Sequence, residues 1–281
     1  MDNTIVQALI MGIVQGLTEF LPISSSGHLI IVPFLFGWDD AFITSLAFSV
    51  MLHLGTLAAL LVYFRADWVR MVPAGFAAIR DRSFRDDPDR RLGWLLVAAT
   101  IPAAVIGYLL NDVVEAAFHE GGPDAVKVVA VTLMAGGVIL WLADRFGRMD
   151  RRIGDVTFPI AIGIGAAQAL ALIPGISRSG ISISAARFAG LDRDAAARFS
   201  FLMATPITAG AIIFEVRRLV AGDAGAPVEL VPLLVGMLTA FVAGVFAIGI
   251  LLRYLRTHSL TVFVIYRFVL AGIVLAFVAT R

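Results

Sequence analysis

The sequence predicts an all-α polytopic membrane protein with six transmembrane helices and two re-entrant helical hairpins, arranged as an inverted-topology repeat. Three observations lead to this fold class. Hydrophobic residues make up 59% of the 281 residues and charged residues only 15%, whereas soluble domains contain about 25% charged residues. Long uncharged segments alternate with short basic loops, and a motif rich in serine and glycine occurs twice. Apolar segments therefore count as membrane spans rather than as a soluble core.

Composition also excludes several classes of function. A net charge of +1 gives no electrostatic basis for binding nucleic acid. The absence of cysteine excludes disulfides, thiolate metal sites, iron–sulfur clusters and cysteine nucleophiles. The N-terminal segment lacks the basic region and small-residue cleavage site of a signal peptide, so we expect it to belong to the mature protein.

Six segments are apolar and long enough to cross the hydrocarbon core, which takes about 20 residues. They are residues 43–64, 92–111, 125–143, 199–214, 230–252 and 259–279. The segment at 199–214 is shorter than the others. Eight or more full spans would place some of the basic loops on the wrong face.

Two further apolar stretches are interrupted by proline, glycine and serine. Residues 4–20 are followed by LPISSSGH and a short apolar run at 29–36, and residues 156–173 by PGISRSG and a run at 181–190. Non-helical backbone at membrane depth is tolerated only where it is buried in protein or lines a wet cavity. We therefore expect two re-entrant hairpins of half-length helices, at 4–36 and 156–190.

The loop charges predict sidedness. Four loops are rich in arginine: residues 65–91, 144–155, 187–198 and 253–257. The loop at 112–124 has acids and no Lys or Arg, and the loop at 215–229 is equivocal. By the positive-inside rule, the four basic loops are cytoplasmic and both termini lie outside.

The two interrupted segments are related in sequence. Residues 15–27 (QGLTEFLPISSSG) and 168–180 (QALALIPGISRSG) align without a gap and share a Gln, a Leu, an Ile, two Ser and a Gly. Each half of the chain then has one hairpin and three spans. Because three is odd, the second half enters from the opposite side. The sequence thus predicts a single membrane domain, 1–281, with repeat one at 1–143 and repeat two at 156–279.

The two breaks are predicted to form an anion site. Each ends in Ser-x-Ser-Gly at the start of a short helix, where free N–H groups, the helix dipole and serine hydroxyls favour an anion. Arg178 adds a planar cation suited to phosphate oxygens, or else a structural counter-ion for Glu19. Glu19, on one helix face with Gln15, is expected to hold a divalent cation or to handle protons. His28 is a candidate nucleophile, base or acid.

Three other polar residues are weaker candidates. His53 is expected to hydrogen-bond a neighbouring helix, and Glu215 to reach toward the membrane interface. Arg267 is expected either to pair with Glu19 or to support the site.

The sequence at these motifs resembles the undecaprenyl-diphosphate phosphatase family, the bacitracin-resistance proteins of bacterial membranes. The resemblance rests on QGLTEFLPISSSGHL at 15–29 and PGISRSG at 174–180, with support from FSFLMATP at 199–206 and IYRF at 265–268. It implies hydrolysis of undecaprenyl diphosphate to undecaprenyl phosphate and phosphate. That reaction recycles the lipid carrier for peptidoglycan synthesis and confers bacitracin resistance. The resemblance also implies the bacterial cytoplasmic membrane and an active site that opens to the outer face.

The resemblance also implies site residues. The catalytic set is Glu19, Ser25, His28 and Arg178. The substrate-binding set is Gln15, Ser24, Ser26, Gly27, Ser177, Ser179 and Gly180. A divalent cation, Mg²⁺ or Ca²⁺, is expected at Glu19, although Gln15 stands where many members have glutamate, which leaves one carboxylate fewer here. The hypothesis for the nucleophile is Ser25, with His28 exchanging its proton; attack by His28 or by metal-bound water stays open.

Two other functions fit parts of the pattern. A second lipid phosphatase family also has Ser-Gly-His and Ser-Arg motifs, but the Lys-x6-Arg-Pro and His-x3-Asp that it requires are missing here. A transporter or flippase of a lipid phosphate or another anion would use the same repeat and the same anion site. Transport, however, does not require an acid–base pair such as Glu19 and His28. The expected partners are a polyprenyl diphosphate substrate and membrane lipids, with no nucleic acid; a homodimer is left open.

Overall fold

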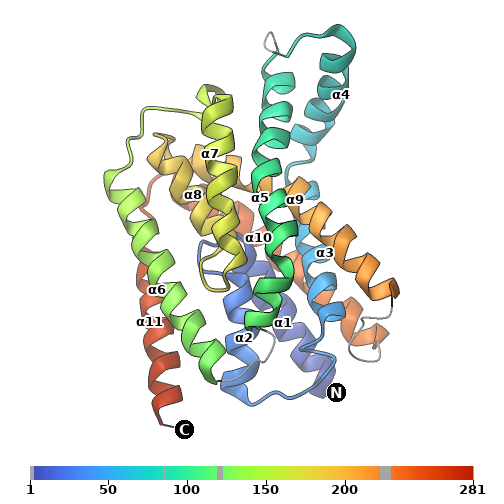
Figure 1. Cartoon of the computed structure of the whole chain (residues 1–281), viewed down its shortest axis with the longest axis vertical. Coiled ribbons are helices and arrows are strands. Elements are labelled where there is room, and N and C mark those ends of the chain that lie inside the picture. The colour runs from blue at the N-terminus through green and yellow to red at the C-terminus, as the bar shows by residue number, and fades with distance from the viewer. Residues whose placement is uncertain (1–2, 85–86, 119–122, 222–228, 281) are drawn as a thin grey trace.

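The computed structural model describes residues 3–84, 87–118, 123–221 and 229–280, and within these ranges the regular structure is helical, without a named strand (Figure 1). The helices are α1 (Asn3–Phe20), α2 (Ser25–Phe36), α3 (Leu46–Tyr63), α4 (Arg65–Asp81), α5 (Pro88–Phe118), α6 (Pro123–Phe146), α7 (Phe158–Gln168), α8 (Arg178–Phe188), α9 (Arg193–Ala221), α10 (Leu230–Leu255) and α11 (Thr261–Ala279). Two short 3₁₀ turns, η1 (Ile153–Asp155) and η2 (Ala169–Leu172), flank α7.

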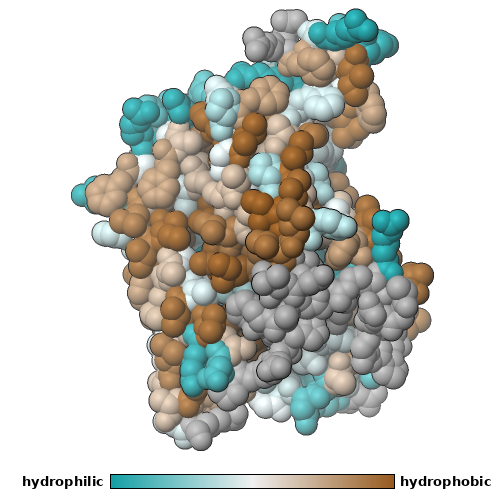
Figure 2. All heavy atoms as spheres, viewed as in Figure 1, coloured by the Kyte–Doolittle hydropathy of each residue, from teal (hydrophilic) through white to brown (hydrophobic). Residues whose placement is uncertain are grey.

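The all-α polytopic class is confirmed by the lengths and apolar character of the helices. Among the described residues, α5, α6, α9, α10 and α11 are each long and apolar enough to cross a membrane. A sixth candidate is the pair of α3 and α4, which are bent by 82° where they meet. On the face that Figure 2 shows, hydrophilic side chains gather at the upper end and apolar side chains cover much of the region below it.

The arginine-rich loops meet at one end of the molecule. Arg198 donates hydrogen bonds to both carboxylate oxygens of Asp67, at 2.8 and 2.7 Å. Arg91 donates to the carbonyl oxygens of Gly154 and Val156, at 3.1 and 2.7 Å. Helix α1 begins and α11 ends at the opposite end (Figure 1). The basic loops therefore share one face, as the positive-inside rule requires of cytoplasmic loops.

The two interrupted segments form helix pairs that approach each other from opposite ends. Helices α1 and α2 lie toward the end where the chain begins, and α7 and α8 toward the arginine-rich end (Figure 1). Where the pairs meet, Ser179 Oγ at the second break donates to the carbonyl oxygen of Leu21 at the first, at 3.2 Å. The division of the chain into two repeats stays a prediction.

Helix α1 covers the segment predicted at 4–20, and α10 packs along it. A side chain at Gly12 would collide with the backbone of Gly236, and one at Gly16 with the backbone of Ala240 and Gly244. Glycines at these positions let the two backbones approach closely, which is the usual way membrane helices pack.

Two spans differ in extent from the predicted ranges. Helix α9 begins at Arg193, ahead of the predicted 199–214, because Asp192 caps it: Oδ1 accepts a hydrogen bond from Ala195 N at 2.7 Å. At its far end it runs to Ala221, into the equivocal loop at 215–229, of which 222–228 lie outside the described residues. Helix α5 runs to Phe118, into the predicted acidic loop at 112–124, of which 119–122 lie outside.

An aromatic cluster fixes the end of α1 against two other helices. Phe20 packs edge-to-face on Phe201 of α9 with ring centroids 5.6 Å apart, and Phe64, which follows α3, lies 6.4 Å from the Phe201 ring. All three side chains are almost fully buried. Because Glu19 directly precedes Phe20, this packing holds its carboxylate between α3, α8 and α9.

Candidate active site

Each break in the chain contains a serine with a positive φ angle. Ser24 has φ 75° and Ser177 has φ 80°, a region that residues other than glycine rarely adopt. Each of these serines caps the helix that follows. Ser24 Oγ accepts a hydrogen bond from Gly27 N at 3.3 Å, and Ser177 Oγ accepts one from Gly180 N at 3.1 Å. The two matching motifs therefore fold into the same local structure.

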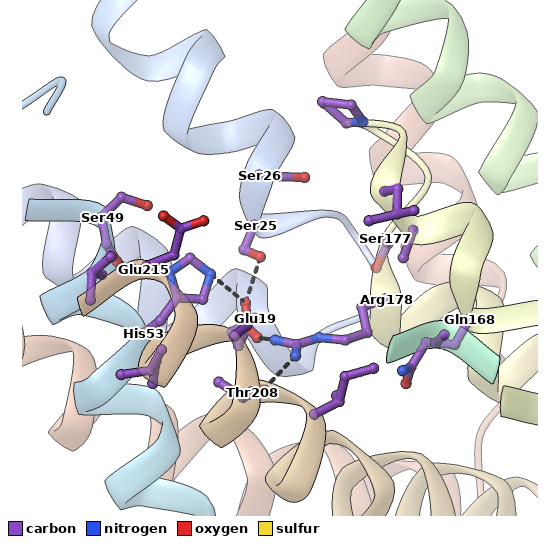
Figure 3. A pocket seen from close by; sticks show the side chains of 18 of the residues that line it. Glu19, Ser25, Ser26, Ser49, His53, Gln168, Ser177, Arg178, Thr208 and Glu215 are labelled. Carbon is purple, nitrogen blue, oxygen red and sulfur yellow. Dashed lines mark hydrogen bonds and ion pairs between the residues drawn. The ribbon is translucent and has the colours of Figure 1, made fainter. Parts of the chain in front are cut away.

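The middle residues of the two Ser-x-Ser motifs, Ser25 and Arg178, point into a common cavity (Figure 3). The flanking serines hydrogen-bond to each other: the Oγ atoms of Ser24 and Ser26 are 3.3 Å apart, and those of Ser177 and Ser179 are 3.2 Å apart. The shared framework thus presents a hydroxyl in the first repeat and a guanidinium in the second.

Glu19 lies where these two groups meet. Its Oε2 accepts hydrogen bonds from Ser25 Oγ at 2.6 Å and from Gln15 Nε2 at 3.1 Å. Its Oε1 forms an ion pair with Arg178, whose other terminal nitrogen donates to Thr208 on α9. A buried carboxylate is stable only when it is paired and hydrogen-bonded, and each of its oxygens has such a partner here.

The cavity has a volume of about 570 Å³, within the range typical of small-ligand sites. It lies between the two breaks, α3, α5 and α9, and apolar side chains cover much of its wall. Its polar lining consists of Glu19, Ser25, Ser26, Ser49, His53, Gln168, Ser177, Arg178, Thr208 and Glu215. A polar cluster at the centre of an apolar wall suits a ligand with a charged head and an apolar body.

The model of the family described as bacitracin resistance protein BacA matches residues 8–273 of this chain. The chain belongs to the BacA family. It is 44% identical over 277 residues to an undecaprenyl-diphosphatase of Thermomicrobium roseum, with 98% of each chain covered. It is 45% identical over 273 residues to one of Desulforudis audaxviator, with 97% of each covered, and 45% identical over 277 residues to one of Geobacter sulfurreducens, with 99% of each covered.

In this member of the BacA family, His28 faces away from the nucleophile that it was predicted to serve. Its Nδ1 donates to the carbonyl oxygen of Ser24 at 2.6 Å, so its Nε2 is the acceptor for Tyr266 OH at 2.7 Å. The two rings also stack, with centroids 5.7 Å apart. Ser25 is paired with Glu19 instead. The hydroxyl of Ser25 therefore donates its hydrogen bond to a carboxylate, and the contacts of His28 hold the first break to α11.

His53 is placed differently from its prediction. Its Nδ1 donates to the carbonyl oxygen of Ser49 on its own helix, at 2.8 Å, rather than to a neighbouring helix. Its Nε2 lies 3.9 Å from Glu19 Oε2. Glu215, expected at the membrane interface, lines the same cavity (Figure 3). The signal for His53 was the pair of polar residues at 49 and 53, one helical turn apart in an apolar span.

Arg267 supports the site without pairing with Glu19. Its fully buried side chain donates from Nε to the carbonyl oxygen of Pro22 at 2.6 Å, and from Nη1 to that of Ile176 at 3.0 Å. These carbonyls belong to the two breaks, where the backbone lacks helical partners and needs other donors. Glycines at 136 and 180 leave room for the guanidinium. One arginine on α11 therefore joins both breaks.

The described residues of this BacA family member do not form a metal site by themselves. Among them there is no group of three or more His, Cys, Asp or Glu placed to hold an ion. Both oxygens of Glu19 already face hydrogen-bond donors, and Gln15 presents an amide nitrogen where a second carboxylate would be needed. No chemical step is therefore assigned to a metal here.

The predicted substrate-binding residues divide by position. Ser26 and Ser177 line the cavity. Ser24 and Ser179 are buried beside the breaks, and Gln15 is buried beneath Glu19. Gly27 and Gly180 donate their backbone N–H groups to the capping serines. Which of these residues contact substrate stays a prediction.

Proposed function

We propose that this chain hydrolyses undecaprenyl diphosphate to undecaprenyl phosphate and phosphate. The names of its BacA-family relatives support this activity. The observation that carries it is the contact of Ser25, Glu19 and Arg178 in one cavity. These residues supply a hydroxyl nucleophile, a proton acceptor and a cation for phosphate, which is the set that phosphoryl transfer to a serine requires.

The terminal phosphate binds at Arg178 and at the N-terminal ends of α2 and α8. A guanidinium binds two phosphate oxygens in parallel, and helix N-termini favour anions. Binding in this way moves Arg178 from Glu19 to the substrate. The Glu19 carboxylate is then free to accept a proton. The apolar wall of the cavity takes the part of the prenyl chain next to the headgroup.

Ser25 Oγ attacks the terminal phosphorus, and its proton passes to Glu19 Oε2, the oxygen 2.6 Å away. The bond from this phosphorus to the bridging oxygen breaks, and the electron pair leaves with undecaprenyl phosphate. Water then attacks the phosphoserine, restores the Ser25 hydroxyl and releases phosphate, with Glu19 again exchanging the proton. Arg178 balances the charge of the phosphoryl oxygens in both steps.

A divalent cation, Mg²⁺ or Ca²⁺, belongs to the proposal as an ion that Glu19 and the diphosphate oxygens would hold together. Mg²⁺ commonly binds through one or two carboxylates plus substrate phosphates. When bound, such an ion would neutralise negative charge on the diphosphate. Loss of activity in chelator and its return with added Mg²⁺ or Ca²⁺ is the test.

We place this enzyme in the bacterial cytoplasmic membrane with its cavity open to the outer face. Ser49 near the start of α3 and Glu215 near the end of α9 both line the cavity. These helix ends lie away from the arginine-rich loops. An outward opening suits recycling of the carrier lipid for peptidoglycan synthesis. We propose that the same reaction at the outer face confers bacitracin resistance.

The test is phosphate release from undecaprenyl diphosphate by the purified full chain. Rapid quenching with labelled substrate should trap phosphoserine at Ser25. Labelled phosphohistidine, or turnover without any covalent phosphate, would replace the Ser25 step by attack from histidine or water. Movement of lipid phosphate across vesicles without phosphate release would overturn the phosphatase and favour a flippase, which broken helices also serve.

A further inference from the structure

We propose that Gln168 is a substrate-binding residue whose side-chain amide donates a hydrogen bond to a phosphoryl oxygen of the diphosphate. This inference rests on the proposed phosphatase and adds a residue to its binding site. Gln168 is the last residue of α7, at the second break, and it lines the cavity. Figure 3 shows it on the same side of the cavity as Arg178 and across from His53.

The amide of Gln168 is buried without a partner. The residue is 3% exposed, and neither its Oε1 nor its Nε2 has a hydrogen-bond partner among the described residues. A buried amide that forms no hydrogen bond is unfavourable, because folding has removed it from water without replacing that contact. Because Gln168 lines the substrate cavity, a bound ligand can supply the missing hydrogen-bond partner.

The equivalent residue of the first repeat shows what kind of partner fits. Gln15 aligns with Gln168, and its Nε2 donates to Glu19 Oε2 one helical turn ahead, at 3.1 Å. The residue that aligns with Glu19 is Leu172, which also lines the cavity. The second repeat therefore keeps the amide and lacks the anion. A phosphoryl oxygen supplies that negative charge from the ligand.

The contact requires only a change in side-chain conformation. The terminal torsion of glutamine is broad, so the amide can turn toward the cavity without moving α7. Its neighbours across the break, Ser177 and Arg178, already face the cavity. Gln168 with Arg178 and the start of α8 then holds the phosphate from the second repeat, while Ser25 and Glu19 act on it from the first.

The experiment compares Gln168→Met, of similar volume but without the amide, with Gln168→Glu, which puts a negative charge against the phosphate. Kinetics on undecaprenyl diphosphate and thermal unfolding with and without inorganic pyrophosphate are measured on the full chain. A hydrogen bond to a charged group corresponds to about tenfold or more in binding. Gln168→Met should therefore raise KM about tenfold and change kcat little, and Gln168→Glu should raise KM further.

Thermal unfolding separates binding from structure. Without ligand, Gln168→Met should unfold at or above the wild-type temperature, because an unpaired amide has been removed. Pyrophosphate should raise the unfolding temperature of the wild type and have little effect on Gln168→Met. The matched control is Gln7→Met, another buried glutamine with an unpaired Oε1, on α1 and outside the cavity lining. It should keep the wild-type KM and pyrophosphate response.

The outcomes distinguish this inference from the phosphatase itself. A wild-type chain that releases no phosphate defeats the proposed function. A wild-type chain that does, together with Gln168 variants of unchanged KM and unchanged pyrophosphate response, defeats the role of Gln168 alone. A fall in unfolding temperature for Gln168→Met without ligand, with KM unchanged, would assign the residue to packing.

Discussion

Glu19 contacts both halves of the site. It accepts hydrogen bonds from Ser25 of the first break and pairs with Arg178 of the second. Its carboxylate is almost fully buried, so each of these partners matters for its stability as well as for its chemistry. Changes at Glu19 and Arg178 are therefore expected to affect substrate turnover more strongly than changes elsewhere in the cavity.

Glu19→Gln should lower phosphate release by about 10²–10⁴-fold, because the amide keeps the shape of the side chain but cannot accept the Ser25 proton. The measurement is kcat on undecaprenyl diphosphate, with circular dichroism to verify helix content. A carboxylate introduced by Gln15→Glu would not replace Glu19 as proton acceptor, since the side chain at position 15 contacts Glu19 and not Ser25. Near-normal turnover by Glu19→Gln would rule out its role as proton acceptor.

Arg178→Lys should lower activity relative to the wild type, because a lysine is a point charge and cannot form two parallel bonds to phosphate. We expect kcat/KM to fall by at least about tenfold, the usual loss for a missing hydrogen bond to a charged group. The control is Arg198→Lys at the arginine-rich end, where Arg198 pairs with Asp67 outside the cavity. Equal activities of the two variants would make Arg178 a simple counter-ion.

At the scale of single residues, the sequence was sufficient to predict the site residues within the two motifs. It was insufficient to predict the contacts of residues that packing brings in from other helices. Ser25, Glu19 and Arg178 meet as the motif predicts. Arg267 has the second of its two predicted roles, support of the site, whereas His53 hydrogen-bonds within its own helix and not to a neighbouring one. A single span does not reveal which of its faces is turned toward which neighbour. The pairing of His28 with Tyr266 joins residues far apart in the chain and has no local signal.

The helical elements were predictable from apolar length, loop charge and the positions of Pro, Gly and Ser. The breaks were recognisable because a broken helix leaves backbone groups that must be satisfied at membrane depth. The groups that hydrogen-bond this exposed backbone could not be identified from the sequence. Arg267 reaches from α11 to carbonyl oxygens at both breaks, and only the folded chain brings these three segments together.

Arg267→Lys should lower both stability and activity, because one ammonium cannot reach the carbonyl oxygens of Pro22 and Ile176 together. Each lost bond from a charged donor costs about 1.5–3 kcal/mol. The control is Arg187→Lys: Arg187 is also fully buried, and it donates to backbone carbonyls at the arginine-rich end, such as that of Gly147 at 2.9 Å. Unfolding temperature and kcat per folded molecule are measured on both. Loss of kcat in Arg267→Lys alone is expected; equal loss in both would show a general effect of instability.

At the scale of the whole molecule, the separation between the cavity and the arginine-rich end gives a test of orientation. The chain has no cysteine, so single cysteines can be introduced directly. Ser26→Cys, in the cavity, should react with a membrane-impermeant thiol reagent added to intact cells, and prenyl diphosphate should protect it. Arg80→Cys, exposed at the arginine-rich end, should react only from the cytoplasmic side. The reverse pattern would invert the proposed orientation.

The close contact of α1 with α10 has a consequence for how the chain is made. The glycines of α1 fit against backbone that is synthesised near the C-terminal end of the chain. Helix α1 must therefore stay in the bilayer without this partner until α10 has been translated. A chain that stops before α10 would leave the glycine-lined side of α1 exposed to lipid and to membrane proteases. Premature termination before α10 is thus expected to remove the protein from the cell rather than to produce a shortened enzyme.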